Sequence, residues 1–256
     1  MIPDIYQEIV RLTAEGEQAA LVTIVSTSGS TPREEGAKML VRADGSILGT
    51  IGGGSLEAQV CQQAIEVIRQ GKPQRLNFRL KEGEEPGMIC GGDVEVFIEP
   101  ILSSPTLYIF GGGHISLPLA KIGKLLGFKI AVIDDRAEFA NPQRFPEADL
   151  TLAEDFKKAF PQLKIDKASY IAIVTRGHQY DELVLEWAVG TKAKYIGMIG
   201  SKTKNKAIFS HLLAKGFSQE LLDKVHAPIG LEIYAQTPEE IALSIMAEIV
   251  KVRRSA

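Results

Sequence analysis

The chain has 256 residues, of which 45% are hydrophobic, and a formal net charge of −3. This length and apolar content predict one or two folded domains and exclude a disordered chain. The slightly acidic balance argues against nucleic acid and anionic membranes as partners. The two cysteines, Cys61 and Cys90, are too few for a disulfide framework and favour a reducing compartment. With no apolar run of about 20 residues and no signal-peptide core, we expect a cytoplasmic protein.

The first part of the chain mixes helical and strand patterns. An amphipathic helix is predicted over Pro3–Glu15, and a second begins at a glycine-rich turn and extends to Gln70. Strands are predicted over Ala20–Ser26, Ala37–Arg42, Ser46–Ile51, Arg75–Leu80 and Val94–Glu99. The composition changes at Ile98–Pro105, which contains two prolines and two serines. We therefore predict a small N-terminal α+β domain over residues 1–103.

Residues 104–256 alternate between strand and helix patterns instead. Predicted strands are Leu107–Phe110, Lys129–Ile133, Ala148–Leu152, Ser169–Thr175 and Lys194–Ile199. A helix is predicted over Asp181–Val189, and the last helix begins at Thr237 and Pro238, with Glu240 in position for a capping box. This alternation predicts an α/β domain with a Rossmann-like, doubly wound parallel sheet.

The first strand of this domain leads into Gly111, Gly112 and Gly113 and then into a helix. This is the dinucleotide-binding arrangement, in which the glycines allow a tight turn and close approach of a phosphate to the helix N-terminus. Asp134 follows Gly113 by 21 residues, the spacing of an acid that binds a ribose hydroxyl. Ser116 stands where the third glycine is expected. An anionic, nucleotide-like ligand is predicted, and the alternative is a domain that keeps the fold without the ligand.

The carboxyl ends of parallel strands meet at one edge of a sheet, so four loops are expected to gather there. They bring cationic side chains, Lys204 among them, around the glycine turn. His114 either donates to the ligand or caps the helix, and the lysines are either ligand contacts or solvated side chains. The candidate binding residues at this edge are Gly111, Gly112, Gly113, His114, Asp134, Asp135, Arg176, His178, Ser201 and Lys202.

The N-terminal domain has a second candidate site at another glycine-rich turn that opens a helix. Its residues are Gly52, Gly53, Gly54 and Ser55, with Arg33 and Cys90 in loops that can close over them. A thiol near N–H groups and an arginine ionises more readily, so Cys90 is a candidate ligand. The alternative for Cys90 is a small buried hydrophobe, and Cys61 is interpreted as a core residue.

Catalytic and metal-binding residues are not assigned. The two cysteines and four histidines do not have the spacing of a metal site, and no Ser–His–Asp order can be argued from the sequence.

The motifs GSTPREEGAKMLV, GTIGGGSLE, ICGGDVEVFIEP, YIFGGGHIS, VIDDR, RGH, YIGMIGSKTK, HAPIGLEI and TPEEIALSIMAEI, in this order, resemble the XdhC/CoxI family. The resemblance implies an accessory protein that binds molybdenum cofactor (molybdopterin), supports its sulfuration with a cysteine desulfurase and inserts it into a xanthine dehydrogenase-type molybdoenzyme. It implies a chaperone more than a catalyst, with an NAD-binding-type Rossmann domain. The chain departs from the family at Ile233-Tyr234-Ala235, where we expect glycine in the middle position.

Two other interpretations remain open. The fingerprint at Gly111–Ser116 and Asp134 is compatible with an NAD(P)-dependent oxidoreductase, in which Asp134 favours NAD and Arg136 leaves NADP open. A nucleotide-sensing scaffold is the third interpretation. The apolar faces of the first and last helices lead us to expect a homodimer.

Overall fold

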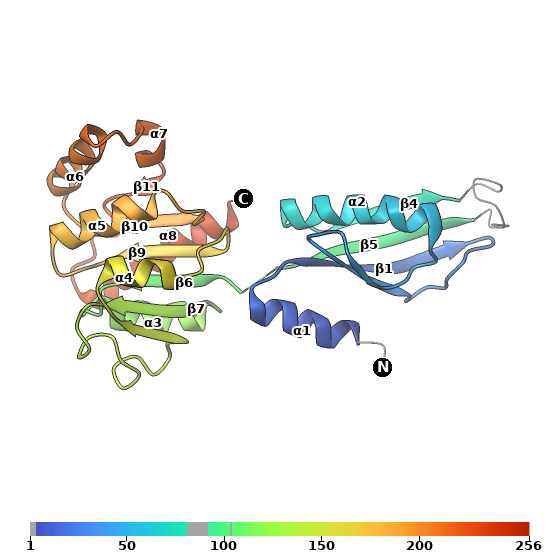
Figure 1. Ribbon diagram of the computed structural model, residues 1–256, viewed down its shortest axis with the longest axis horizontal. Coiled ribbons are helices and arrows are strands. Elements are labelled where there is room, and N and C mark those ends of the chain that lie inside the picture. The colour runs from blue at the N-terminus through green and yellow to red at the C-terminus, as the bar shows by residue number, and fades with distance from the viewer. Residues whose placement is uncertain (1–3, 81–91, 103, 256) are drawn as a thin grey trace. The chain divides into compact units, whose positions relative to one another are not determined.

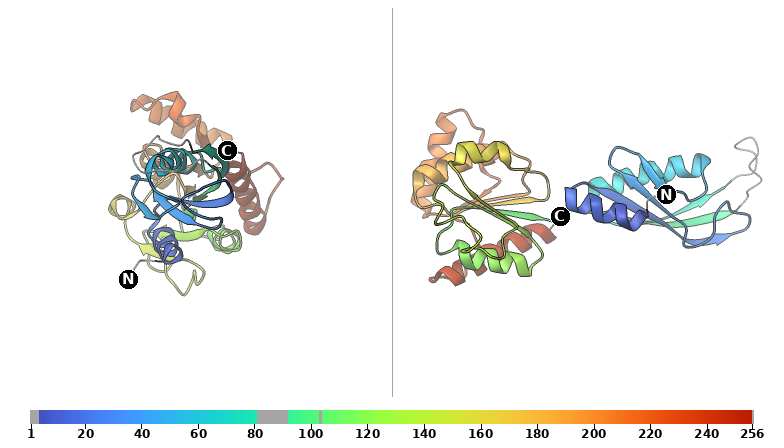
Figure 2. Two further views of the ribbon diagram at one scale, coloured as in Figure 1. Left: turned by 90° about the vertical axis from the view of Figure 1, so that its right-hand side faces the viewer. Right: turned by 60° about the horizontal axis from the view of Figure 1, so that its bottom comes forward.

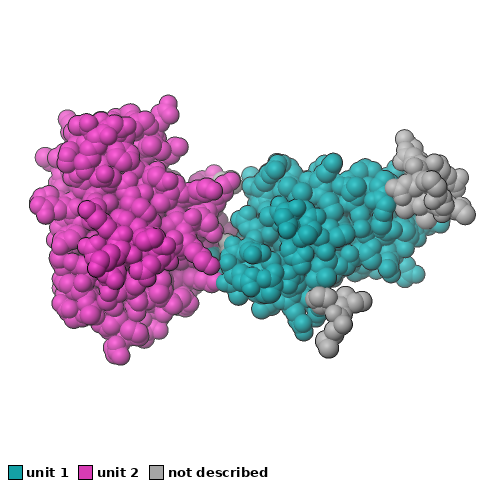
Figure 3. Space-filling model, in the orientation of Figure 1, with its two compact units in different colours: residues 1–104 teal, residues 105–256 magenta. Residues whose placement is uncertain are grey.

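The structure is a computed structural model that describes residues 4–80, 92–102 and 104–255. The chain forms two compact units, residues 1–104 and 105–256 (Figure 3). Each unit has its own hydrophobic clusters, and each is described by itself below.

The first unit is built on an antiparallel sheet with the strand order β3-β2-β1-β5-β4. The strands are β1 (Ala19–Ser28), β2 (Lys38–Arg42), β3 (Ile47–Gly49), β4 (Gln74–Arg79) and β5 (Asp93–Ile101). Helices α1 (Ile5–Glu15) and α2 (Gly54–Gln70) lie on opposite faces of the sheet (Figure 1). Side chains alternate between the faces of a strand, so Ala20 and Val22 pack with α2 while Ala19 and Leu21 pack with α1.

The second unit has a six-stranded parallel sheet with the order β11-β10-β9-β6-β7-β8. The strands are β6 (Thr106–Phe110), β7 (Lys129–Asp134), β8 (Leu150–Ala153), β9 (Ser169–Ile173), β10 (Tyr195–Met198) and β11 (Val225–His226). Counted along the chain within this unit, the spatial order is 3-2-1-4-5-6, which is the doubly wound Rossmann order. The predicted fold class, a small α+β domain followed by a Rossmann-like sheet, is confirmed.

Helices cover both faces of this sheet (Figure 2). On one face, α3 (Ser116–Leu125) and α8 (Pro238–Arg254) pack on each other and on the strands. On the other lie α4 (Phe156–Ala159), the 3₁₀ turn η1 (Phe160–Gln162), α5 (His178–Ala188), α6 (Lys202–Ala214) and α7 (Gln219–Leu222). Strands β6, β7, β9 and β10 are therefore buried on both sides, which explains their continuous apolar runs.

Several local expectations need adjustment. The short elements α4, η1, α7 and β11 were not predicted, because a segment of two to four residues is too short to show a period. Strand β9 ends at Ile173 instead of Thr175, and α5 begins at His178 instead of Asp181, so the turn between them is shorter than expected. The predicted capping box of α8 is confirmed, since Glu240 N donates to Thr237 Oγ1 and Thr237 N donates to the Glu240 carboxylate.

Candidate functional site

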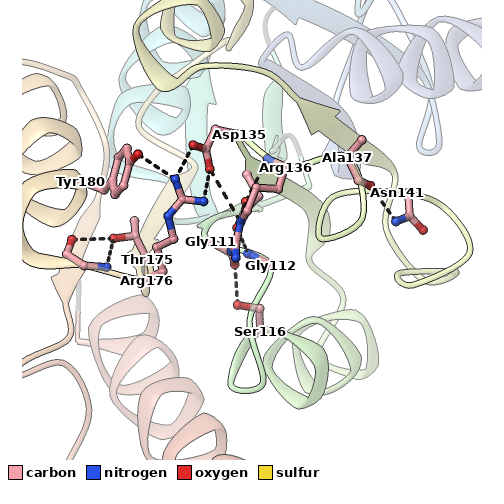
Figure 4. Close-up of polar contacts among 12 residues, drawn as sticks. Gly111, Gly112, Ser116, Asp135, Arg136, Ala137, Asn141, Thr175, Arg176 and Tyr180 are labelled. Carbon is pink, nitrogen blue, oxygen red and sulfur yellow. Dashed lines mark hydrogen bonds and ion pairs between the residues drawn. The ribbon is translucent and has the colours of Figure 1, made fainter.

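The carboxyl edge of the parallel sheet brings together the loops that follow β6, β7 and β9 (Figure 4). These loops carry the glycine turn, the Asp134–Arg136 segment and the Thr175–Tyr180 segment, as the sequence predicts. In a parallel sheet this edge is where ligands bind, and we therefore take these loops as the candidate site.

The glycine turn after β6 is shaped by close approaches of neighbouring backbone. Gly111 has a φ of 105°, and a Cβ there would lie 2.4 Å from the Val174 carbonyl oxygen. A Cβ on Gly112 would lie 2.0 Å from the Phe139 carbonyl oxygen, whereas a Cβ on Gly113 would meet nothing within 4 Å. Gly111 and Gly112 are thus required by the packing of the protein itself. Gly113 leaves open space, which is what the approach of a ligand needs.

Ser116 has a defined role at the start of α3. Its side chain is fully buried and its hydroxyl donates to the Gly111 carbonyl oxygen (Figure 4). The serine at the third fingerprint position therefore ties the helix to the glycine turn. Among the described residues no side chain caps α3, and His114 is exposed beside it. The first-turn N–H groups of α3 thus lack the partner that a side-chain cap supplies.

Asp134 ends β7 with its carboxylate buried, only 3% of the side chain being exposed. Its Oδ2 accepts from Gly112 N at 2.8 Å and from Arg136 Nη2 at 3.0 Å, while Oδ1 accepts from Arg136 N and Nε at 3.1 and 2.9 Å. Burial by itself would raise the pKa of Asp134, but the hydrogen bonds from Arg136 and Gly112 outweigh it and the pKa is lowered. Asp134 is therefore an ionised acid held by the protein's own donors.

Arg136 is itself fixed by an aromatic contact that the sequence did not indicate. Its guanidinium carbon lies 3.6 Å from the centre of the Phe139 ring, and Arg144 lies over the same ring at 5.2 Å. Arg144 Nε also donates to the Gly112 carbonyl oxygen at 3.0 Å. The loop after β7 thus folds back over the glycine turn. The contact between Arg144 and Gly112 joins residues 32 positions apart, which only the fold brings together.

Arg176 pairs with the neighbouring acid, Asp135. Its Nη1 and Nη2 donate to the two carboxylate oxygens at 2.9 and 2.7 Å, and Nη2 also donates to the Tyr180 hydroxyl at 2.7 Å (Figure 4). The Arg176 side chain is 37% exposed. Asp135 follows β7 and Arg176 follows β9, and β6 lies between these strands. The pair therefore spans the sheet edge at the strand that carries the glycine turn.

Three further basic residues were predicted at this edge. Lys204 is paired with an acid, whereas Lys202 and His178 are exposed to solvent. Lys204 Nζ donates to Asp181 at 2.7 Å, and Asp181, fully buried, also accepts from the Thr175 hydroxyl at 2.6 Å. Lys204 thus holds the turn after β9, a role that depends on the unpredicted acid Asp181. Lys202 and His178 are exposed at the first positions of α6 and α5.

Ser201 acts as the N-cap of α6. Its side-chain oxygen accepts from Lys204 N at 3.3 Å. Capping occupies this hydroxyl with the protein's own helix.

In the first unit, the turn at Gly52–Ser55 contains an internal carboxylate. Glu57 Oε1 accepts from Ile51 N and Gly53 N, both at 3.0 Å, and from the Thr50 hydroxyl at 2.5 Å. Burial acts to raise the pKa of Glu57, but these hydrogen bonds prevail and the pKa is lowered. Two backbone N–H groups at the predicted anion site are thus already bonded to a carboxylate of the helix that the turn opens. A glutamate in the first helical turn is the sequence signal for such a contact.

The end of β1 and the loop that follows it, together residues 28–36, lie against two of the predicted motifs. A Cβ on Gly52 would lie 2.4 Å from Pro32 Cγ, and a Cβ on Gly92 would lie 2.3 Å from the Ser28 carbonyl oxygen. Arg33, exposed in the same loop, follows Pro32 directly. Cys90 lies outside the described residues, two positions before Gly92. Cys61 is half-buried in α2 against the core, and burial raises the pKa of its thiol.

Tyr234, in the segment before α8, has a φ of 58° and is 85% exposed. A left-handed φ favours glycine, so the departure from the family pattern falls at a position where the backbone conformation favours glycine.

Within the described part of the chain, no group of three or more histidine, cysteine, aspartate or glutamate side chains is placed to hold a metal ion. None of the described helices combines the length and the hydropathy that a membrane crossing requires.

Comparison with family models gives two matches, one in each unit. The model of the XdhC Rossmann domain matches residues 107–249, and that of the XdhC and CoxI family matches residues 12–79.

Three relatives extend over nearly the whole chain. The Escherichia coli K12 protein YqeB is 36% identical over 99% of this chain and 47% of its own length, so the chain spans about half of that protein. A Bacillus subtilis protein described as a probable xanthine dehydrogenase subunit is 23% identical over 95% of this chain and 96% of its own length. The Escherichia coli molybdenum cofactor insertion chaperone PaoD is 25% identical over 98% of this chain and 90% of its own length.

A solved structure has the same fold. The crystal structure of a Bacillus halodurans protein described as a xanthine dehydrogenase superposes with a TM-score of 0.54, at 23% identity, over 97% of this chain and 95% of that one. The XdhC Rossmann model alone matches more than half of the 256 residues, and the second model matches the other unit, so the chain belongs to the XdhC and CoxI family.

Proposed function

We propose that this chain is an accessory protein that binds molybdenum cofactor and delivers it to a xanthine dehydrogenase-type molybdoenzyme. The observation that carries the proposal is the relation to PaoD, a molybdenum cofactor insertion chaperone, over 98% of this chain and 90% of PaoD. Both units are included in this match, so the likeness is not limited to the common Rossmann fold. The relation to the probable xanthine dehydrogenase subunit of Bacillus subtilis supports the same class of client.

The carboxyl edge of the second unit has chemistry suited to the phosphate of the cofactor. Gly113 lies beside the N-terminus of α3, which no described side chain caps, and has open space at its Cα. The exposed residues His114, His178 and Lys202 add donors at this edge, and Arg176 is a planar donor that suits a phosphate as well as its present partner Asp135. We assign the phosphate-binding role to these residues. Asp134, Ser201 and Lys204 have structural roles.

The first unit, taken by itself, offers a second and alternative candidate for cofactor binding, through a ligand for the molybdenum head group. A thiolate is a soft ligand that suits a dithiolene-bound metal, and of the two cysteines Cys90 is the one we assign to this role. Arg33 and the turn Gly52–Ser55 are the groups proposed around it, since Pro32 packs on Gly52 and Gly92 packs on Ser30 of the same loop. Cys61 is assigned no part in binding, because it packs against the core.

Three further parts of the proposal concern assembly and maturation. We propose that a cysteine desulfurase is the source of the sulfur in the sulfurated cofactor. The protein is proposed to act in the cytoplasm and as a homodimer. Each part has a direct test: sulfur transfer in a reconstituted mixture, cell fractionation and sedimentation of the purified protein.

The first experiment is anaerobic binding of freshly released molybdenum cofactor to the purified full chain, followed by gel filtration. Co-elution of molybdenum and pterin with the protein in stoichiometric amounts is the expected result. The variant Cys90→Ala should lose most of the bound molybdenum, while Cys61→Ala should retain it, because that thiol lies against the core. Absence of co-elution with the wild-type chain contradicts the cofactor role. Equal binding by both variants contradicts the role of Cys90 alone.

A further inference from the structure

A Rossmann unit with this glycine turn implies an adenine dinucleotide as its ligand. In that mode the acid at the end of the second strand accepts hydrogen bonds from the ribose hydroxyls. The residue at this position is Asp134, the last residue of β7. Whether the unit fits NAD(H) or NADP(H) therefore depends on whether this carboxylate has capacity left for a ribose.

The Asp134 carboxylate has a full set of partners within the protein. An ionised carboxylate has about four acceptor sites, and Asp134 accepts four hydrogen bonds, one from Gly112 and three from Arg136. Only 3% of its side chain is exposed. A ribose diol would have to replace the Arg136 guanidinium, which binds the two oxygens with one nitrogen each. Such a charge-assisted pair is stronger than a bond to a neutral hydroxyl.

Arg136 is also held from its other side. Its guanidinium lies 3.6 Å from the centre of the Phe139 ring, and a cation over an aromatic face is stabilised. The Phe139 carbonyl oxygen lies against Gly112, and Arg144 donates to the carbonyl of the same glycine. The arginine therefore cannot swing away without losing both its acid and its aromatic partner.

The adjacent acid does not provide a substitute. Both oxygens of Asp135 accept from Arg176, at 2.9 and 2.7 Å. The two consecutive acids at the end of β7 are thus each bound by an arginine through both oxygens. In this structure neither acid fits the ribose-binding role that the fold implies.

We propose that Arg136 closes the ribose position of this Rossmann unit, so that the turn at Gly111–Ser116 does not take up NAD(H) or NADP(H). Arg136 is then a specificity-determining residue that acts by occupying Asp134. NADP(H) is excluded as well, because a 2′-phosphate brought to Arg136 would face the Asp134 carboxylate, which is of like charge. This inference is independent of the cofactor proposal, since it concerns a different ligand and a separate titration.

The test is to titrate the full chain with NADH and with NADPH. Binding is measured by calorimetry and by the fluorescence of the reduced nicotinamide. The wild-type chain should show no saturable binding up to about 1 mM. Arg136→Met keeps an apolar stem against Phe139 but frees Asp134, and it should bind NADH at least about tenfold more tightly than wild type. Arg136→Lys, which offers one compact charge in place of the planar fork, should give a smaller gain.

The matched control is Lys204→Met, which removes a different charge-assisted contact at this sheet edge, the one to Asp181, and leaves Asp134 and Asp135 bound to their arginines. It should not gain NADH affinity. Saturable binding of either dinucleotide by the wild-type chain overturns the proposal, and this measurement does not depend on any variant folding. A gain in Lys204→Met equal to that in Arg136→Met also overturns it, because loosening of the sheet edge would then suffice.

Discussion

The two glycine-rich turns of the chain look alike in sequence but are satisfied in different ways. At Gly52–Ser55 an acid of the helix itself, Glu57, accepts three hydrogen bonds through a single oxygen. At Gly111–Ser116 the acid is Asp134 on the next strand, which uses both oxygens and requires Arg136 to complete its contacts. A glycine-rich turn at a helix start is therefore not by itself an open anion site. The contacts of the nearby acids decide how many hydrogen-bonding groups of the turn remain available to a ligand.

The largest expected effect is a loss of stability that distinguishes Gly112 from Gly113 in the second turn. Gly112→Ala places a Cβ 2.0 Å from the Phe139 carbonyl oxygen, and we expect it to lower the free energy of unfolding of this unit by about 3 kcal/mol. Gly113→Ala meets nothing within 4 Å and should change it by less than about 1 kcal/mol. Denaturant unfolding followed by the fluorescence of Trp187, the chain's single tryptophan, measures both.

The same pair of variants tests the proposed phosphate approach. Gly113→Ala should weaken cofactor retention although the unit stays folded, because the new methyl group fills the space beside α3. If both variants destabilise the unit equally, the inference that Gly112 is closely packed while Gly113 has open space is contradicted.

The next effect compares the two internal acids. Asp134→Asn replaces one oxygen with an amide donor that faces a donor of Gly112 or Arg136, and it should cost about 2 kcal/mol. Glu57→Gln keeps the single oxygen that accepts all three hydrogen bonds and should cost about 1 kcal/mol or less. Equal costs for the two variants would contradict the distinction between one-oxygen and two-oxygen binding.

The pH dependence of Asp134→Asn follows from the sign of the shift. Because the pKa of Asp134 is lowered in the folded unit, its ionised form contributes stability at neutral pH. That contribution is lost as the pH falls below the ordinary aspartate value of 3.8 towards the lowered one. The stability gap between wild type and Asp134→Asn should therefore narrow below about pH 4. A gap that stays constant from neutral pH into acid would show that the Asp134 charge does not stabilise the unit.

The fold could be predicted from the sequence because its signals are local. Alternating and helical periods mark the strands and helices, and the fingerprint at Gly111–Gly113 and Asp134 identifies the Rossmann unit. The occupancy of the site could not be predicted, because it depends on contacts made only after folding. Gly112 reaches Asp134 across 22 positions, Arg144 reaches Gly112 across 32, and Lys204 reaches Asp181 across 23. Glu57 and Arg136 make local contacts instead. The partners of Glu57 lie within seven residues, and an acid in a first helical turn indicates such contacts. Arg136 contacts Asp134 and Phe139, two and three residues away.

The smallest expected effect concerns a turn that lacks the glycine its backbone favours. Tyr234 has a φ of 58° and is 85% exposed, so its side chain offers little packing in exchange for a left-handed backbone that costs about 1 kcal/mol. Tyr234→Gly removes this cost but adds freedom to the unfolded chain, and we expect a net gain of about 0.5 kcal/mol or less. Thermal unfolding of the full chain measures the change. Tyr234→Ala is the matched control, because it removes the ring but keeps the Cβ that makes this φ unfavourable. A gain in Tyr234→Ala equal to that in Tyr234→Gly would place the effect in the exposed ring instead of the backbone.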